Sequence, residues 1–421
     1  MVDQDSWDWD VGKRSIPVAE WRDRFRWVEE PYVSPDGESI AAVVNQDEGE
    51  FTVCVNGQAW DSVFDKVWHL RFTPDGRAAA LVSEMGEWTV AVDGTAWEQK
   101  FAYVWNPMFS ADGRHIAVAV QNDMKYCLAV DGTPWERSFD NMTYFAMSPE
   151  GEHTAAAVQV ESFETANIES FQKGVFAAAL DGTPWDRHFL NVWNLAISDD
   201  GSHLAAEVRL NLYEYSIAVD GNAWDQSFSC VWEPVFRPGG ASAVAPVRVA
   251  GGKWTLAESG RILWDRRFAQ VWQQQFSPGG GCLAAIVAPR YGRWTVAVDG
   301  NPWSVTLGQM VTDLTFSPDG KRIAALGKEE ERWRIVVDGS VWSNTFDMAW
   351  RPVFSPDGQN VAALVEKNGK YTVAVNDRLW ERECDAAWSP VFSTDGTAIL
   401  LRSLEDGTYY RRIKSVNDWV R

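Results

Sequence analysis

Residues 316–325 read Phe-Ser-Pro-Asp-Gly-Lys-Arg-Ile-Ala-Ala, and this stretch decides the fold. Asp-Gly between two apolar runs is a strong β-hairpin signal, because the turn needs a positive φ that glycine adopts without strain. One short strand is therefore predicted to end at Phe316, and a second is predicted to begin at Ile323. The same signal recurs along the whole chain.

Ten tetrapeptides resemble this turn, and their final glycines lie 39, 37, 38, 50, 39, 40, 40, 38 and 38 residues apart. They are Ser34–Gly37, Thr73–Gly76, Ser110–Gly113, Ser148–Gly151, Ser198–Gly201, Arg237–Gly240, Ser277–Gly280, Ser317–Gly320, Ser355–Gly358 and Ser393–Gly396. A fixed period of this length is the signature of a repeat fold. The one spacing of 50 predicts a hairpin insertion at about 160–173.

Each unit predicts four short antiparallel strands. Residues 107–109, 116–120 and 126–130 form three apolar runs, and a second Asp-Gly turn then leads to Trp135 and Phe139. Second strands such as residues 154–158 are apolar on both faces, which predicts a sheet packed between two others. We therefore expect an all-β fold, a β-propeller of about ten four-stranded blades. Two smaller rings are the alternative.

The two ends of the chain favour closure of the last blade by the N-terminus. Trp21 and Phe25 carry the end of a unit that lacks its earlier strands. Residues near 18–26 are therefore expected to supply the outer strand of the last blade, although Trp419 could take that part. We expect a tail at 1–17 that is acidic and contains Trp, followed by a single propeller domain at 18–421.

The chain contains 25 tryptophans, and one set follows the second Asp-Gly turn at a fixed offset. Because a recurring Trp brings a large apolar area to each unit, we expect this set to dock neighbouring blades. We call these residues the box tryptophans: Trp21, Trp60, Trp97, Trp135, Trp185, Trp224, Trp264, Trp303, Trp342 and Trp380.

A second set lies eight residues before the final glycine of the turn. We call these residues the collar: Trp68, Trp105, Trp193, Trp232, Trp272, Trp350 and Trp388. Glu29, Thr143 and Thr312 occupy the same position in the other three units. The position precedes the innermost strand, so the collar is expected at the channel rim, where exposed tryptophans form a partner-binding surface. The alternative is that they cover the ends of the blades as core.

Composition excludes several function classes. The 59 acidic and 38 basic residues give a net charge of −21, which argues against nucleic acid and against an anionic membrane surface. The five cysteines form no CxxC motif, and no nucleophile elbow or phosphate loop is present. We therefore expect no catalytic residues, no metal and no cofactor. The scattered cysteines, and a start without an apolar signal segment, favour the cytoplasm.

The stretch at 316–325 closely resembles the WD40-like repeat of TolB-type propellers. The whole chain also resembles the tryptophan-rich subunit of the Tmc transmembrane redox complex of sulfate-reducing bacteria. That resemblance implies a cytoplasmic location, peripheral at the inner face of the membrane, with iron–sulfur and membrane subunits as partners. It assigns no catalytic residue.

The sequence thus favours a non-catalytic interaction subunit of a membrane-associated electron-transfer complex, without direct membrane insertion. An acidic surface would steer a basic partner toward it. The alternative is a small-molecule or carbohydrate-binding propeller, with hydrolase activity as a variant, that uses the tryptophan-lined rim.

Overall fold

The computed structural model describes residues 3–162, 172 and 174–420. Its strands form ten antiparallel sheets, and each sheet has four strands side by side, the first of which is split in two of the sheets. The prediction of an all-β propeller with ten four-stranded blades is confirmed. The described residues fall into two compact units. Unit 1 comprises Phe25–Pro35 and Ala41–Leu263, and unit 2 comprises Asp3–Arg24, Asp36–Ile40 and residues 264–420.

Unit 1 holds six blades, in which each strand pairs with the next along the chain. The first strand of its first blade is split into two short pieces that both pair with β4. The blades are β2 (Trp27–Val28), β3 (Tyr32–Val33), β4 (Ile40–Asp47), β5 (Glu50–Val55) and β6 (Gln58–Ala59); β7 (Lys66–Phe72), β8 (Ala78–Glu84), β9 (Glu87–Val92) and β10 (Thr95–Ala96); β11 (Tyr103–Phe109), β12 (Ile116–Asn122), β13 (Lys125–Val130) and β14 (Thr133–Pro134); β15 (Met142–Met147), β16 (Thr154–Gln159), β17 (Phe176–Leu180) and β18 (Thr183–Pro184); β19 (Asn191–Ile197), β20 (Leu204–Arg209), β21 (Tyr215–Val219) and β22 (Asn222–Ala223); and β23 (Val235–Phe236), β24 (Ala243–Val249), β25 (Lys253–Glu258) and β26 (Arg261–Ile262).

Unit 2 holds four blades of the same design. They are β27 (Gln270–Phe276), β28 (Leu283–Arg290), β29 (Arg293–Val298) and β30 (Asn301–Pro302); β31 (Met310–Phe316), β32 (Ile323–Glu329), β33 (Arg332–Val337) and β34 (Ser340–Val341); β35 (Met348–Ala349), β36 (Val353–Phe354), β37 (Val361–Lys367), β38 (Lys370–Val375) and β39 (Arg378–Leu379); and β40 (Ala386–Phe392), β41 (Ala398–Glu405), β42 (Thr408–Ser415) and β1 (Gly12–Pro17). Across both units, the helices of the described residues are short: η1 (Gln4–Ser6), η2 (Val18–Glu20), α1 (Trp21–Arg24), η3 (Ala250–Gly252) and α3 (Asn417–Val420).

The predicted turns hold each blade together by side-chain to backbone hydrogen bonds. In the blade β11–β14, Ser110 Oγ accepts from the backbone N–H of His115 at 3.0 Å. Asp131 Oδ1 accepts from the backbone N–H of Ile116 at 2.9 Å, which ties the second Asp-Gly turn to the start of β12. Asp131 itself has a φ of 49°, a conformation that aspartate tolerates better than most residues.

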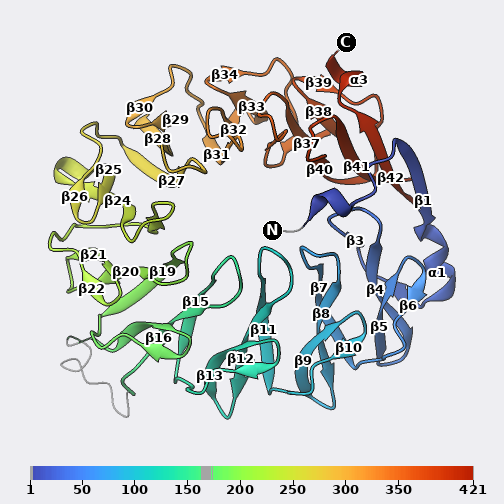
Figure 1. Cartoon of the computed structure of the whole chain (residues 1–421), viewed down its shortest axis with the longest axis horizontal. Helices are drawn as coiled ribbons and strands as arrows, with labels where there is room; N and C mark the ends of the chain where they lie inside the picture. Colours follow the sequence, from blue (N-terminus) through green and yellow to red (C-terminus); the bar gives the residue numbers. More distant parts are fainter. Residues whose placement is uncertain (1–2, 163–171, 173, 421) are drawn as a thin grey trace. The chain divides into compact units, whose positions relative to one another are not determined.

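The second strands form the cores of the blades. Residues 116–120 of β12 are all buried, as are residues 204–208 of β20. Successive side chains of a strand point to opposite faces, so both faces of these sheets are covered by apolar neighbours. Within unit 1 the first strands β7, β11, β15 and β19 lie on the concave side of the arc of blades (Figure 1), and the short fourth strands lie on its outer side.

The N-terminal strand completes the last blade, as predicted, but its position differs from the expected one. Gly12–Pro17 pairs with Thr408–Ser415, whereas residues near 18–26 were expected to form this strand. Residues 18–24 instead form η2 and α1, and Trp419 lies in α3. The aromatic spacing located the box residue Trp21 but gave no signal for β1, because Gly12–Pro17 is mostly exposed and carries little apolar pattern.

The insertion predicted at about 160–173 falls largely on residues 163–171 and 173, outside the described residues. On either side of it, β16 ends at Gln159 and β17 begins at Phe176.

Candidate functional site

The two ends of a blade carry different features. One end holds the Asp-Gly turns, and we call the other the hairpin end, because it carries the hairpin that joins the second and third strands. In the blade β7–β10, Lys66 pairs with Ser83 and Glu84 pairs with Glu87, so the start of the first strand lies beside this hairpin. The collar residues therefore lie toward the hairpin end of their blades.

A β-bulge follows the collar position in many blades. The next residue has a positive φ at His69, Asn106, Tyr144, Asn194, Gln273 and Asp313. The strand register shifts at the same place, for example between Trp105 and Met108. A bulge bends its strand and increases the local twist, so it redirects the chain directly after the collar side chain.

Every collar tryptophan packs on the aromatic residue of the third strand in its own blade. The ring centroids lie 4.4–6.2 Å apart, in the pairs Trp68–Trp88, Trp105–Tyr126, Trp193–Tyr215, Trp232–Trp254, Trp272–Trp294, Trp350–Tyr371 and Trp388–Tyr409. The sequence analysis did not predict this pairing. An aromatic pair contributes about 0.5–1.5 kcal/mol beyond the burial of its area.

The collar side chains keep part of their surface in solvent. Trp68 is 45% exposed and Trp232 is 41% exposed, and the other five are partly buried. Glu29 and Thr143, at the same position in two other blades, are exposed, and Thr312 is partly buried. The collar thus combines core packing with an accessible aromatic surface. It shares features of both interpretations of the sequence, an exposed binding surface and a core cover for the blade ends.

A buried carboxyl group lies beside the collar in the blade β19–β22. Glu207 pairs with Trp193 across the strands and is only 8% exposed. Asn194 Nδ2 donates to Glu207 Oε2 at 2.9 Å. Burial, with the negative charge of Glu233 as a further cause, raises the pKa of Glu207 to about 7. The sequence analysis missed this residue.

A comparison of the repeats would have revealed Glu207. The residue opposite the collar position is apolar in the other blades of unit 1: Val43, Leu81, Ala119, Ala157 and Pro246. A glutamate at this buried position departs from the repeat and adds a polar group to the seam that faces β23–β26. Burial of a carboxyl group is costly, so the fold keeps it partly neutral.

The box tryptophans lie against turns of the following blade. A Cβ built on Gly94 would lie 3.1 Å from Trp60, and one built on Gly132 would lie 3.5 Å from Trp97. Trp135, Trp185 and Trp224 meet Gly182, Gly221 and Gly260 in the same way within unit 1, and Trp264 and Trp303 meet Gly300 and Gly339 within unit 2. Trp21 and Trp380 are buried, and Trp342 is partly buried.

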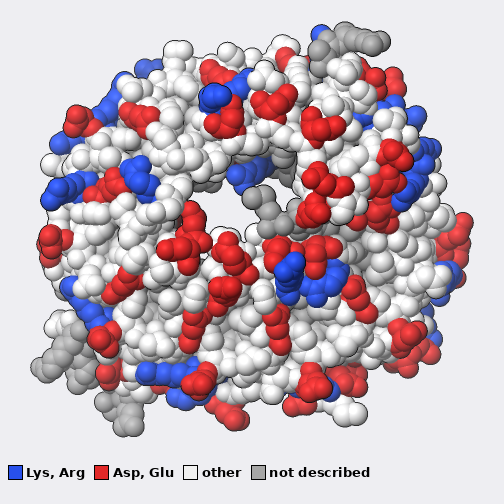
Figure 2. Space-filling model, viewed as in Figure 1, with Lys and Arg blue, Asp and Glu red and all other residues white. Residues whose placement is uncertain are grey.

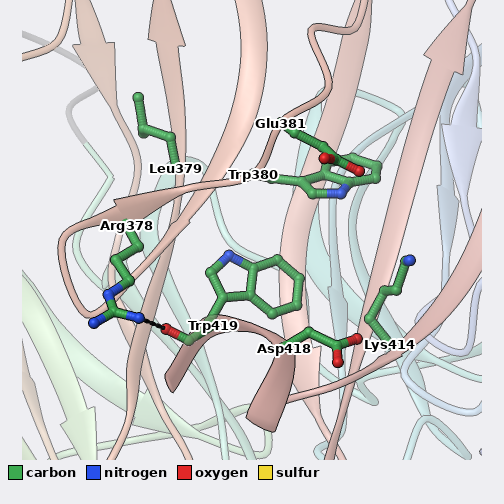
Figure 3. A pocket seen from close by; sticks show the side chains of 7 residues that line it. All are labelled: Arg378, Leu379, Trp380, Glu381, Lys414, Asp418 and Trp419. Atoms are coloured by element: carbon green, nitrogen blue, oxygen red, sulfur yellow. Dashed lines mark hydrogen bonds between the residues drawn. The ribbon is translucent and has the colours of Figure 1, made fainter. Parts of the chain in front are cut away.

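A cleft of about 390 Å³ lies beside α3 in unit 2 (Figure 3). Trp380 and Trp419 line it, and Arg378 Nη1 donates to the carbonyl oxygen of Trp419 at 2.7 Å. Both indoles are less than 9% exposed and belong to the same apolar cluster as Ile399. These tryptophans therefore pack the C-terminal helix against the last two blades.

The described residues include two buried or partly buried thiols and three histidines that contact turn aspartates. Burial raises the pKa of Cys127 and of Cys384 to about 11, so both thiols are protonated and weakly nucleophilic at neutral pH. His115, His153 and His203 each lie 2.6–2.7 Å from a turn aspartate of their own blade. In the described residues, no group of three or more His, Cys, Asp or Glu side chains could hold a metal. No helix of that same part of the chain is long and apolar enough to cross a membrane.

Comparisons with known proteins add structural likeness only. No family model matches the chain. No curated protein matches it significantly. Among solved structures, the crystal structure of a eukaryotic initiation factor is 14% identical, covering 78% of this chain and 89% of that chain, with a TM-score of 0.47.

Two further solved structures are similar to this chain. The β-propeller domain of Cps50 (Swd1) from Myceliophteria thermophila is 14% identical, covering 66% of this chain and 97% of that one, with a TM-score of 0.32. The Dos1 propeller is 13% identical, covering 74% and 90%, with a TM-score of 0.39. Likeness at this level carries no argument about function.

Proposed function

We propose that this chain is a non-catalytic protein-interaction subunit that docks its partner on the collar. The observation that carries the proposal is the repeated pairing of a collar tryptophan with a third-strand aromatic, with Trp68 and Trp232 more than two-fifths exposed. Tryptophan is enriched at the energetic centres of protein interfaces. A rigid ring that is already packed on one side loses little conformational entropy on binding.

The test is co-purification of the tagged chain from its native host. Replacing Trp193 and Trp232 by alanine should reduce recovery of the stably bound protein at least tenfold, because tryptophan hot spots contribute about 2 kcal/mol or more each. Tyr291→Ala is the matched control, since Tyr291 is 82% exposed at a hairpin tip outside the collar. Unchanged recovery with the double variant, with its circular dichroism spectrum intact, would refute docking on the collar.

The finer proposal is that the partner belongs to a membrane-associated electron-transfer complex. Its support is the whole-chain resemblance to the Tmc tryptophan-rich subunit, together with a net charge of −21 that would steer a basic partner. Gently solubilised membranes of the host should then yield haem and iron–sulfur proteins with the tagged chain. Recovery of a partner without redox groups would contradict membership of an electron-transfer complex but would agree with a role in protein interaction.

A further inference from the structure

Aromatic rings form a continuous row across three consecutive blades of unit 1. The row runs from Trp68 to Trp88 at 4.8 Å, on to Tyr103 at 5.7 Å, to Trp105 at 5.9 Å and to Phe145 at 6.2 Å between ring centroids. We call these five residues the aromatic ladder. It joins β7–β10, β11–β14 and β15–β18, whereas each collar pair by itself stays within one blade.

The ladder is accessible and is bordered by exposed apolar side chains. Trp68 is 45% exposed and Tyr103 is 40% exposed. The hairpin tips beside them carry Met85 and Met124, which are 90% and 75% exposed. The backbone N–H of Met85 donates to Asp65 Oδ2 at 2.7 Å, which fixes this tip next to the start of β7. Flexible methionines beside rigid rings suit the binding of apolar side chains.

The ladder already holds a cation from its own chain. Lys66 Nζ lies 5.9 Å from the ring centroids of both Trp68 and Trp88. The face of an indole ring attracts a positive charge through its quadrupole, with Trp the strongest of the aromatic residues. Lys66 is exposed, so a partner cation could take its place at little cost.

Charge around the ladder favours a basic occupant. The segments that border it at the hairpin end, 65–68, 84–88, 100–105, 122–126 and 140–145, contain five acidic and three basic residues. Lys100 pairs with Glu84, and Lys125 pairs with Asp140, which leaves an acidic excess of two with Lys66 on the rings. Figure 2 shows acidic side chains gathered elsewhere on unit 1 as well, around β15 and β19.

The geometry points to the aromatic ladder as the site for a partner segment that presents arginine or lysine beside apolar residues. The inference rests on the proposed function and names the partner chemistry for one part of the collar. A guanidinium group would stack on Trp68 or Tyr103, because its planar, weakly hydrated cation suits an aromatic face. The neighbouring apolar side chains of the segment would contact Met85 and Met124.

The probe is a matched set of synthetic peptides titrated against the full chain by isothermal calorimetry. The set contains (Gly-Arg-Leu)4, (Gly-Glu-Leu)4, (Gly-Arg-Ser)4 and (Gly-Pro-Leu)4. Relative to the first peptide, the second reverses the charge, the third removes the apolar side chains, and the fourth removes the charge and stiffens the backbone. We expect (Gly-Arg-Leu)4 to bind at least about tenfold more tightly than each of the others. Equal or tighter binding of the acidic or the proline peptide would overturn the inference.

Variants then locate the site. Trp68→Ala with Tyr103→Ala should weaken (Gly-Arg-Leu)4 about tenfold. Because Lys66 competes for the same rings, Lys66→Ala should strengthen binding. Lys66 is exposed, so its replacement should not disturb the fold. Lys125→Ala removes the same charge at the same end of the blades, but the Lys125 side chain pairs with Asp140 and not with a ladder ring. The comparison therefore separates competition for the rings from general electrostatic attraction of the peptide. An equal gain with both lysine variants would contradict the inference.

The two proposals fail separately. If the peptides show no basic preference while Trp193 and Trp232 remain necessary for recovery of the native partner, the inference on the ladder is wrong and the interaction role stands. If neither variant set affects binding, both proposals are wrong.

Discussion

Glu207 shows how one residue departs from its repeat. The other blades of unit 1 place an apolar side chain opposite the collar position, whereas Glu207 places a carboxyl group there at 8% exposure. The acidic side chain that faces it from the next blade is Glu233, which further raises its pKa, and Asn194 is its hydrogen-bond partner. Cys230 and Arg248 lie on the same seam. Burial, with the negative charge of Glu207 as a further cause, raises the pKa of the Cys230 thiol, and the positive charge of Arg248 opposes this shift.

The raised pKa of Glu207 predicts that the stability of the protein depends on pH. The pKa of Glu207 is raised from 4.5 to about 7 in the folded protein, so the folded state binds more protons than the unfolded state between these values. The contribution of Glu207 to the free energy of unfolding therefore falls as the pH rises from about 4.5 to about 7. The loss is on the order of 3 kcal/mol.

Glu207→Gln should remove this slope, because glutamine keeps the shape and the amide contact but does not ionise. Urea unfolding at pH 5 and pH 8 gives the free energy of unfolding of wild type and variant. The variant should be the more stable of the two only at pH 8. Glu214→Gln is the control on the same blade, since Glu214 is exposed and its pKa is lowered by hydrogen bonds from Ser227 and Asn211. If the free energy of unfolding changed with pH in the same way for wild type and Glu207→Gln, the raised pKa of Glu207 would be contradicted.

At the scale of the element, the box tryptophan and the turn glycine of the next blade form one joint. Trp97 packs within the apolar cluster of Phe101 and Val104 and meets Gly132 of the following blade. Gly132 has a φ of 83°, and a Cβ there would lie 3.5 Å from the indole. The glycine therefore serves both the turn and the approach of the ring.

Trp97→Ala should lower the free energy of unfolding by about 3 kcal/mol, because it leaves a cavity between two blades. Trp27→Ala is the comparison, since Trp27 is 50% exposed, and its loss should change the free energy of unfolding by less than about 1 kcal/mol. Guanidinium unfolding followed by circular dichroism gives both values. If both substitutions lowered the free energy of unfolding equally, the box tryptophan would stabilise the fold no more than an exposed tryptophan does.

At the scale of the whole chain, residues from both ends build the last blade. The indoles of Trp7 and Trp9 pack against Ala398, Leu400 and Ile413. Tyr409 Oη donates to the carbonyl oxygen of Gly37 at 2.7 Å, and Arg411 Nε donates to the carbonyl oxygen of Asp36 at 2.9 Å. Both side chains are buried, so these contacts satisfy polar groups that would otherwise be costly.

Removal of residues 1–17 should therefore destabilise unit 2 and promote association. The truncation deletes β1 and leaves the edge of β42 unpaired, and an unpaired edge strand is a template for pairing with other chains. We expect a lower melting temperature by calorimetry and an earlier elution on size exclusion. Removal of residues 1–6 alone keeps Trp7, Trp9 and β1, and should change both measurements little.

The repeat determined most of this fold at the level of sequence. Asp-Gly turns and apolar runs are local signals, since turn conformation and strand alternation depend on neighbouring residues alone. They located the ten blades and their box tryptophans. The position of β1 was missed because an exposed strand such as Gly12–Pro17 is defined by its partner β42 and not by its own pattern.

Tertiary structure alone decided which side chains meet. The spacing placed Trp68 in the collar but gave no ring partner for it, and only the folded sheet brings its ring centroid to 4.8 Å from that of Trp88. The same holds for the continuation of the ladder from Trp88 to Tyr103 in the next blade, and for the burial that moves the pKa of Glu207. Such contacts depend on the packing of one blade against another, which is a long-range property that no local sequence pattern encodes.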